Sequence, residues 1–409
     1  MKKLFGRRLM QWCIRAMALL PLLAGCAAPL QSVSTTTQNL PQRPATPAVN
    51  PQFLSYPGPL ENETQILRLG ADQQAHFLSY LQQADRMDDP RHELTSDYLQ
   101  DLLKGFDYFP KTTGAQFTRA QLRGNCMSLA VLTTALAELA GVQVRYQLID
   151  QTPVFDIRGG LMMTSVHVRT VLVQNHHRYN AGQFVFGQSR LAIDFFPEAN
   201  HRSGRRISRE EFLSMYFRNL SVESLLDNNP ERAMGYAVKA LALTPHREKA
   251  INLVGLLHSR MGDDEGAERF YRFGLTVASH KLELMNNYLG LLQRQGRLVE
   301  AQAMAKEIVS LDESSPFGWL RLAMEAQRQK QFESAVSYYE KSLRYAPDLG
   351  LAWQGLALSL ARSSNDDDEK IVYAQQQAQR FLPEQGAGRS LAKKISIIKG
   401  ASPDDMPAW

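Results

Sequence analysis

The C-terminal half of the sequence repeats every 34 residues, with unit starts near residues 214, 248, 282, 316 and 350. An alanine stands nineteen residues after each of the first four starts, at Ala233, Ala267, Ala301 and Ala335. A small residue at a fixed place in each unit lets two antiparallel helices approach closely. A single helix pair cannot bury its apolar face alone, so the period predicts a solenoid of stacked helix pairs.

The fourth unit carries the fullest set of recurring residues, namely Trp319, Leu322, Ala323, Ala335, Tyr339 and Pro347. This pattern resembles the tetratricopeptide repeat, a 34-residue helix-turn-helix unit. The resemblance implies about five repeats over residues 208–383, and the fifth is expected to be a cap because it loses register at residues 363–370. Such repeats form a concave groove that docks a protein or peptide partner. The alternative is that they only support the domain that precedes them.

In the first half of the chain, a lone cysteine opens an apolar helical pattern. After Cys126, leucines recur at steps of three and four residues until Gly141 ends the pattern. The unpaired N–H groups and the dipole at a helix N-terminus favour a thiolate over a thiol, so Cys126 is a candidate nucleophile. The alternative is a buried, inert cysteine.

The helix is followed by a strand over residues 142–148 and by two further predicted strands, over residues 164–173 and 190–196. In the first of these two strands His167 lies opposite the apolar face, and in the second Asp194 does. On an antiparallel sheet the two side chains can project from the same side. A thiol, an imidazole and a carboxylate are the nucleophile, the base and the orienting group of acyl transfer. Asp150 and Asp156 are alternatives to Asp194.

The order of cysteine helix, histidine strand and aspartate strand resembles the transglutaminase-like superfamily of papain-related folds. The match is best around the cysteine, in the segment that carries Gly124, Ala130, Ala135, Gly141 and Arg145. The resemblance implies an α+β domain over residues 59–207, placed before the all-α solenoid.

By the same resemblance Cys126 attacks an acyl carbon, His167 carries the proton and Asp194 holds the imidazole. The backbone N–H of Cys126 supplies half of an oxyanion site. Gln121 and Asn125 are candidates for the second donor, although Asn125 is equally suited to capping the helix.

The N-terminal segment combines basic residues with an apolar run over residues 16–25, the pattern of a signal peptide of residues 1–25. Leu23-Ala24-Gly25-Cys26 resembles the lipobox of bacterial lipoproteins. This implies a lipid-modified Cys26, and Ala27 after it implies the outer membrane, with the protein facing the periplasm. The alternative is an ordinary cleaved signal. Residues 26–58 are predicted to be a disordered tether, and residues 384–409 a tail in which 390–398 could form a basic helix.

Charge and composition exclude several other classes of function. The net charge of +5 equals the five basic residues of the signal segment, so the rest is near neutral and no nucleic-acid partner is expected. His176 and His177 are adjacent and have no accompanying ligand cluster, so a surface loop is expected there, with no metal or cofactor. The predicted function is a lipid-anchored cysteine hydrolase or acyltransferase that acts on an amide or peptide bond. The alternative is a non-catalytic scaffold or assembly lipoprotein that works through its repeats.

Overall fold

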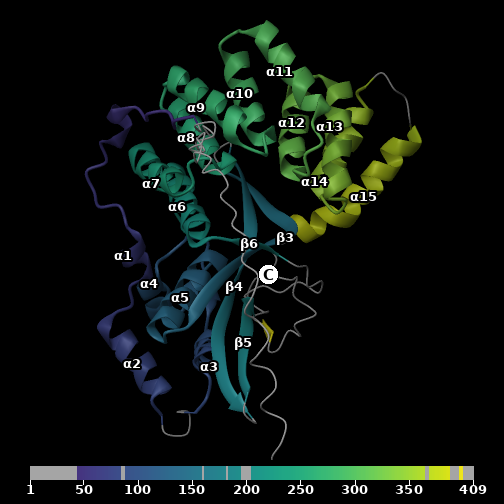
Figure 1. Ribbon diagram of the computed structural model, residues 1–409. Helices are drawn as coiled ribbons and strands as arrows, with labels where there is room; N and C mark the ends of the chain where they lie inside the picture. The colour runs from purple at the N-terminus through teal and green to yellow at the C-terminus, as the bar shows by residue number, and fades with distance from the viewer. Residues whose placement is uncertain are drawn as a thin grey trace, which may run out of the picture. The chain divides into compact units, whose positions relative to one another are not determined.

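The computed structural model describes residues 44–83, 88–158, 161–180, 183–194, 204–363, 368–386 and 396–398 (Figure 1). By its contacts the chain divides into Met1–Arg43 and Pro44–Trp409, and the first unit lies wholly outside the described residues. The predictions for the signal peptide, for Cys26 and for residues 26–43 therefore concern residues outside the described part.

The first half of the described chain is an α+β arrangement of short helices around a sheet. Its helices are η1 (Pro51–Leu54), α1 (Glu63–Leu67), α2 (Ala71–Leu81), α3 (Arg91–Leu103), α4 (Ala115–Gln121) and α5 (Cys126–Leu139). A two-stranded parallel sheet joins β1 (Asp107–Tyr108) to β2 (Arg123–Gly124) just before α5.

Helix α3 begins earlier than its sequence pattern predicts. Thr95 and Ser96 are residue types that favour an N-cap, but the helix begins at Arg91 after Pro90, and both hydroxyl residues are buried inside it. Thr95 Oγ1 donates to the Arg91 carbonyl oxygen at 2.7 Å. This local bond satisfies a buried hydroxyl within the helix, so the residue type alone did not mark the start.

The main sheet has five strands in the order β6-β3-β4-β5-β7. Its members are β3 (Gln143–Arg158), β4 (Leu161–Asn180), β5 (Gln183–Asp194), β6 (Arg205–Ile207) and β7 (Ser396–Ile398), and all its pairings are antiparallel. The apolar residues Val168, Leu172, Leu191 and Ile193 of β4 and β5 join the same buried cluster as the leucines of α5.

The central strands are longer than predicted. Asp156 was placed in a connection, but it pairs with Met163 across β3 and β4. His176 and His177 were placed in a surface loop, but they belong to β4 and pair with residues 187 and 186 of β5. The ladder is made by backbone groups, so it continues through polar residues that interrupt the apolar alternation.

The predicted basic helix over residues 390–398 is wrong for its last three residues. Ser396–Ile398 form β7, in which Ile397 pairs with Ile193 of β5. β-Branched isoleucines suit a pleated edge better than a helix. Residues 387–395 lie outside the described part.

The second half of the chain is a row of helix pairs. The described pairs are α6 (Arg209–Leu226) with α7 (Pro230–Leu243), α8 (Glu248–Arg260) with α9 (Asp264–Val277), α10 (Leu282–Arg294) with α11 (Leu298–Ser310), α12 (Pro316–Arg328) with α13 (Phe332–Tyr345), and α14 (Gly350–Leu360) with α15 (Asp368–Gly386). The predicted starts at 248, 282, 316 and 350 coincide with helix starts. The first pair begins at Arg209 instead of 214, because Ser208 caps α6 by accepting from the Glu211 N–H.

The 34-residue period also appears in the packing and in the turns. Each of the four predicted alanines is buried near the start of the second helix of its pair. The turn between paired helices contains one residue with positive φ in each of the first four pairs: Asn228 (56°), Gly262 (85°), Gly296 (71°) and Lys330 (62°). A left-handed residue at this point reverses the chain after the first helix. Only the two glycines adopt it without steric cost.

The first helix pair shares a core with the sheet. Phe212 of α6 stacks on Tyr146 of β3, with ring centroids 4.2 Å apart and planes 8° apart. Both side chains belong to the buried cluster that contains α5, and Tyr236 and Ala240 of α7 belong to it too. The first repeat is therefore packed against the α+β part rather than linked to it by a flexible joint.

Part of the predicted disordered tether packs on the repeats. Within residues 44–58, Asn50 Nδ2 donates to Asp263 Oδ2 at 3.2 Å, and the Phe53 ring lies 5.3 Å from the His258 ring. Val49 and Phe53 pack against the buried residues of the solenoid. The proline-rich composition predicted a tether, but a few apolar side chains are enough to attach this segment, which we call the strap.

The turn period generates a stability prediction. Changing Gly262 to alanine puts a Cβ on a left-handed residue, which destabilises the fold by about 1 kcal/mol. Changing Lys330 to glycine removes that strain at the equivalent turn. It should stabilise the fold by about 0.5 kcal/mol, because the gain is reduced by the freedom of glycine in the unfolded chain. Urea unfolding measures both changes.

The matched control is Gly290→Ala, since Gly290 lies inside α10 and a Cβ there would meet nothing closer than Arg294 Nη1 at 3.7 Å. Alanine should stabilise this helix by up to about 1 kcal/mol. Equal effects of alanine at 262 and at 290 would contradict the assignment of the turn.

Candidate functional site

Cys126 is the first residue of α5, as the sequence predicted. Asn125 caps the helix, with its Oδ1 accepting from the Ser128 N–H at 2.9 Å. The Cys126 side chain is partly buried and forms no disulfide. It therefore lies beside the unpaired N–H groups of a helix N-terminus, where a negative charge is stabilised.

His167 and Asp194 meet across the β4–β5 hairpin. His167 Nε2 donates to Asp194 Oδ1 at 2.5 Å, and the exposed fractions of the two side chains are 9% and 0%. The hairpin brings together two residues that are 27 positions apart, and their side chains share one side of the sheet, as predicted. Asp194, which was preferred among the three aspartates considered, contacts His167. Asp150 and Asp156 lie in β3.

Arg169 is a third member of this cluster, and sequence reasoning did not select it. Its Nε and Nη2 donate to Asp194 Oδ2 at 3.0 and 2.8 Å, so the carboxylate is held by His167 on one oxygen and by Arg169 on the other. Burial alone would raise the pKa of Asp194, but the bonds from His167 and Arg169 outweigh it and lower the pKa to about 2. The available signal was the two-residue step from His167, which puts both side chains on one face of β4.

The side chain of His167 also interacts electrostatically with Cys126. Burial lowers the pKa of His167, but the hydrogen bond with Asp194 and the interaction with Cys126 more than compensate and raise it to about 9. An imidazole held between a thiol and a buried carboxylate can accept the thiol proton and return it to a leaving group.

The two predicted oxyanion donors have different positions. Asn125 uses its amide as a structural donor, from Nδ2 to Thr112 Oγ1 at 3.0 Å, while its oxygen caps α5. Of the two roles considered for Asn125, the structure shows the cap. Gln121 is exposed at the last residue of α4.

Within the described ranges, no group of three or more His, Cys, Asp or Glu side chains is arranged to hold a metal ion. Among the helices of the described part, none combines the length and the apolar character needed to cross a membrane.

A row of polar side chains follows the first helices of the repeats. Arg218 of α6, Asn252 of α8, Asn287 of α10 and Arg321 of α12 recur every 34 or 35 residues and are partly buried. Asn287 Nδ2 donates to Asn252 Oδ1 at 2.7 Å, and Arg321 Nη1 donates to Asn287 Oδ1. We call these four residues the polar row. The bonds among Asn252, Asn287 and Arg321 connect three successive repeats.

An ion pair lies beside the polar row. Lys249 Nζ of α8 contacts Glu283 Oε1 of α10 at 3.1 Å. The charge of Lys249 is the largest cause of a lowered pKa at Glu283, and Arg321 and Arg218 lower it further. The field along these helices is therefore positive enough to keep Glu283 ionised.

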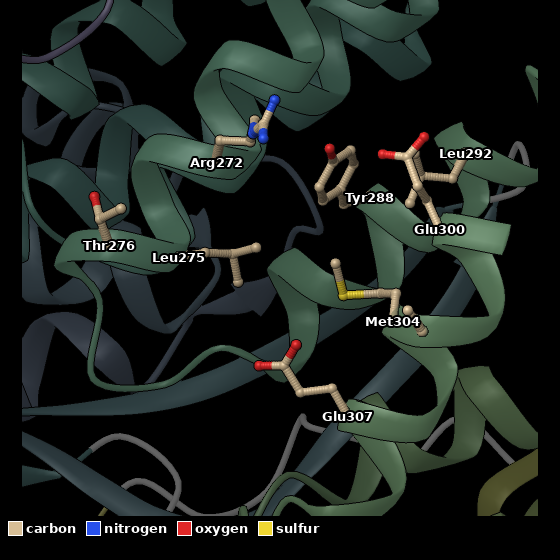
Figure 2. A pocket seen from close by; sticks show the side chains of 9 residues that line it. Arg272, Leu275, Thr276, Tyr288, Leu292, Glu300, Met304 and Glu307 are labelled. Atoms are coloured by element: carbon tan, nitrogen blue, oxygen red, sulfur yellow. The ribbon is translucent and has the colours of Figure 1, made fainter. Parts of the chain in front are cut away.

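A pocket of about 400 Å³ lies between α9, α10 and α11 (Figure 2). Leu275, Leu292 and Met304 supply apolar lining, and Arg272 and Glu300 are among its charged residues. Tyr288 donates its hydroxyl to Glu268 Oε1 at 2.6 Å, which fixes one wall. The pocket is distinct from the polar row. It is also distinct from the group of Cys126, His167, Arg169 and Asp194, which we call the Cys126 cluster.

Comparisons with known proteins agree with the repeat architecture. Residues 318–349 match the family model of the tetratricopeptide repeat, and these residues span α12 and α13. The chain therefore contains tetratricopeptide repeats. No curated protein gives a significant match.

Several solved structures are similar to this chain. Pseudomonas aeruginosa PilF is 25% identical with a TM-score of 0.33, covering 44% of this chain and 80% of that one. PilW, described as a widely conserved type IV pilus biogenesis factor, is 20% identical with a TM-score of 0.31, covering 42% and 78%. YrrB, described as a TPR protein with an unusual peptide-binding site, is 17% identical with a TM-score of 0.27, covering 44% and 89%.

The raised pKa of His167 generates a prediction for stability against pH. The folded pKa of about 9 lies above the ordinary 6.5, so the stabilisation is complete below pH 6.5 and is lost as the pH rises through 9. The loss is on the order of 3 kcal/mol. We expect the wild type to lose this much more stability than His167→Gln between pH 6 and pH 9.5, measured by urea unfolding.

The control variant is His246→Gln, because His246 contacts the Phe273 ring and lies outside the Cys126 cluster. It should keep the wild-type pH dependence. A His167→Gln variant that lost stability with pH as steeply as the wild type would refute the coupling of His167 to Asp194.

Proposed function

We propose that this protein docks an extended segment of a partner protein along the first helices of its repeats and acts as an assembly factor. The observation that carries the proposal is the polar row of Arg218, Asn252, Asn287 and Arg321. Stacked helical repeats present such residues on an extended concave surface.

The chemistry of the polar row suits a peptide backbone. A side-chain amide has two N–H donors and an oxygen with two lone pairs, so it can bond both the C=O and the N–H of an extended peptide. Asn287 donates one N–H to Asn252, and its oxygen accepts from Arg321. These two bonds fix the orientation of its amide. Preorganised groups lose little entropy on binding.

A second candidate function is acyl transfer by Cys126, because His167 bonds Asp194 and its pKa is raised by both Asp194 and Cys126. In this proposal, which matches the resemblance to transglutaminase-like enzymes, Cys126 attacks the carbonyl carbon of an amide and His167 gives its proton to the leaving amine. Water or a second amine then releases the acyl group from the sulfur. Arg169 keeps Asp194 ionised through the cycle.

The two functions are compatible, since a docked partner could present the amide that Cys126 attacks.

We also propose that Cys26 carries a lipid which attaches the protein to the outer membrane on its periplasmic side. This part of the proposal is supported by the Leu23-Ala24-Gly25-Cys26 segment alone.

Binding through the polar row can be tested with peptides selected from a displayed random library on the wild-type protein. Asn252→Ala and Asn287→Ala should each weaken binding about tenfold, since each removes hydrogen bonds to the backbone that are worth about 1 kcal/mol. Fluorescence anisotropy measures the affinity. Gln302→Ala is the control, because Gln302 is exposed on α11 and should leave the affinity unchanged.

The library can also refute the proposal. Selected peptides that bind both asparagine variants as tightly as the wild type would place the docking surface elsewhere.

Acyl-transfer chemistry can be tested by alkylating Cys126 between pH 4 and 9 and following the tryptic peptide Gly124–Arg145, which contains no other cysteine. Because His167 is cationic below a pKa of about 9, its charge should speed the alkylation of Cys126 at pH 5 to 6. We expect His167→Ala to reduce the rate at that pH by at least about tenfold, since an unperturbed thiol has a pKa of about 8.5. Rates that rise only above pH 8 in both proteins would rule out the acyl-transfer candidate.

A further inference from the structure

The loop between β1 and α4 is held from two sides at Thr112, a buried residue. From the first repeat, Glu223 Oε1 of α6 accepts from the Thr112 N–H at 2.8 Å, and Asn219 Nδ2 donates to Thr112 Oγ1 at 3.3 Å. From the other side, Asn125 Nδ2 donates to the same Oγ1 at 3.0 Å. One threonine therefore connects α6 to the residue that caps the Cys126 helix.

The next residue of the loop, Thr113, is also bonded to the first turn of α5. The Thr113 N–H donates to Ser128 Oγ at 2.9 Å, and Ser128 Oγ donates to Asn125 Oδ1 at 3.1 Å. The Ser128 N–H bonds that same oxygen. The first turn of α5, in which Cys126 lies, is thus fixed by a closed set of hydrogen bonds that extends to α6.

We propose that Glu223 and Asn219, on the first helix of the repeats, are positioning residues that hold the Asn125 cap and through it set the reactivity of Cys126. The inference rests on the second candidate function, because it assigns these residues to the Cys126 site. In this proposal the repeat domain, besides docking a partner, is itself part of the Cys126 site.

The chemistry of Glu223 supports a specific role. Burial raises its pKa to about 7, so keeping a carboxyl group at this place costs folding free energy. Lys111 lowers this pKa and Asp227 raises it, and the two pair with each other at 2.8 Å in a half-exposed position. The Thr112 N–H is itself buried, and the carboxyl satisfies it, so the cost is offset by the connection that the carboxyl makes.

The test uses the full-length chain and two readouts, the alkylation rate of Cys126 at pH 6 and the hydrogen–deuterium exchange of the Thr112 and Ser128 amides. Glu223→Ala should slow alkylation about tenfold, the scale of a lost helix cap, and should speed exchange at both amides. Glu223→Gln keeps an acceptor oxygen and should restore both readouts to near wild type. Asn219→Ala should slow alkylation by a smaller factor.

Asp227→Ala is the matched control, since Asp227 lies next to α6 and contacts the same loop through the half-exposed Lys111. It should change neither readout. Unchanged alkylation and unchanged Ser128 exchange in Glu223→Ala would overturn the proposal, as would a Glu223→Gln variant no better than alanine. Alkylation that is slow in the wild type and independent of His167 would end the acyl-transfer candidate, whereas Ser128 exchange would still decide whether α6 controls the cap.

Discussion

The stacking of Phe212 on Tyr146 joins the two halves of this protein. Phe212 is fully buried on α6 and Tyr146 is buried on β3, and around them the apolar side chains of α5, the sheet and the first repeat form one cluster. On its other side α6 bonds α7, with Ser221 Oγ donating to the Ala233 carbonyl oxygen at 2.7 Å. Helix α6 thus belongs to two cores. Removing the repeats would expose the apolar residues that α6 covers, so the α+β part is not expected to be stable without the first helix pair.

The sequence predicted the features that are periodic or local. The 34-residue period identified the starts at 248, 282, 316 and 350 because every unit repeats the same packing. The proximity of His167 and Asp194 followed from strand alternation and a hairpin. Arg169 was missed because a charged residue on a strand usually faces solvent, and its burial depends on a carboxylate contributed by another strand. The strap was missed for a similar reason. Its contact with His258 depends on tertiary packing, which cannot be predicted from the composition of the segment.

Helix α6 contributes Arg218 to the polar row and also contacts the loop that bonds the cap of the Cys126 helix. Arg218 belongs to the polar row and the adjacent residue, Asn219, contacts the loop that leads to Asn125. Successive residues on a helix point in directions about 100° apart, so α6 can present one side chain to a docked partner and the next to the interior. A shift of α6 would therefore alter the hydrogen bonds that hold the Asn125 cap at the start of α5. This arrangement would connect the proposed docking surface to the proposed Cys126 site through one helix.

The strap also determines where a mechanical load enters the protein. Any pull on the chain ahead of Pro44 passes first to Asn50 and Phe53, which are attached at the turn between α8 and α9. The tension is carried there by the Asn50 hydrogen bond, the Phe53–His258 ring contact and the packing of Val49 and Phe53 on the solenoid core, before it reaches the α+β part at α1. The strap therefore passes a pull on the preceding chain to the second helix pair before the α+β part, although the α+β part follows the strap directly in sequence.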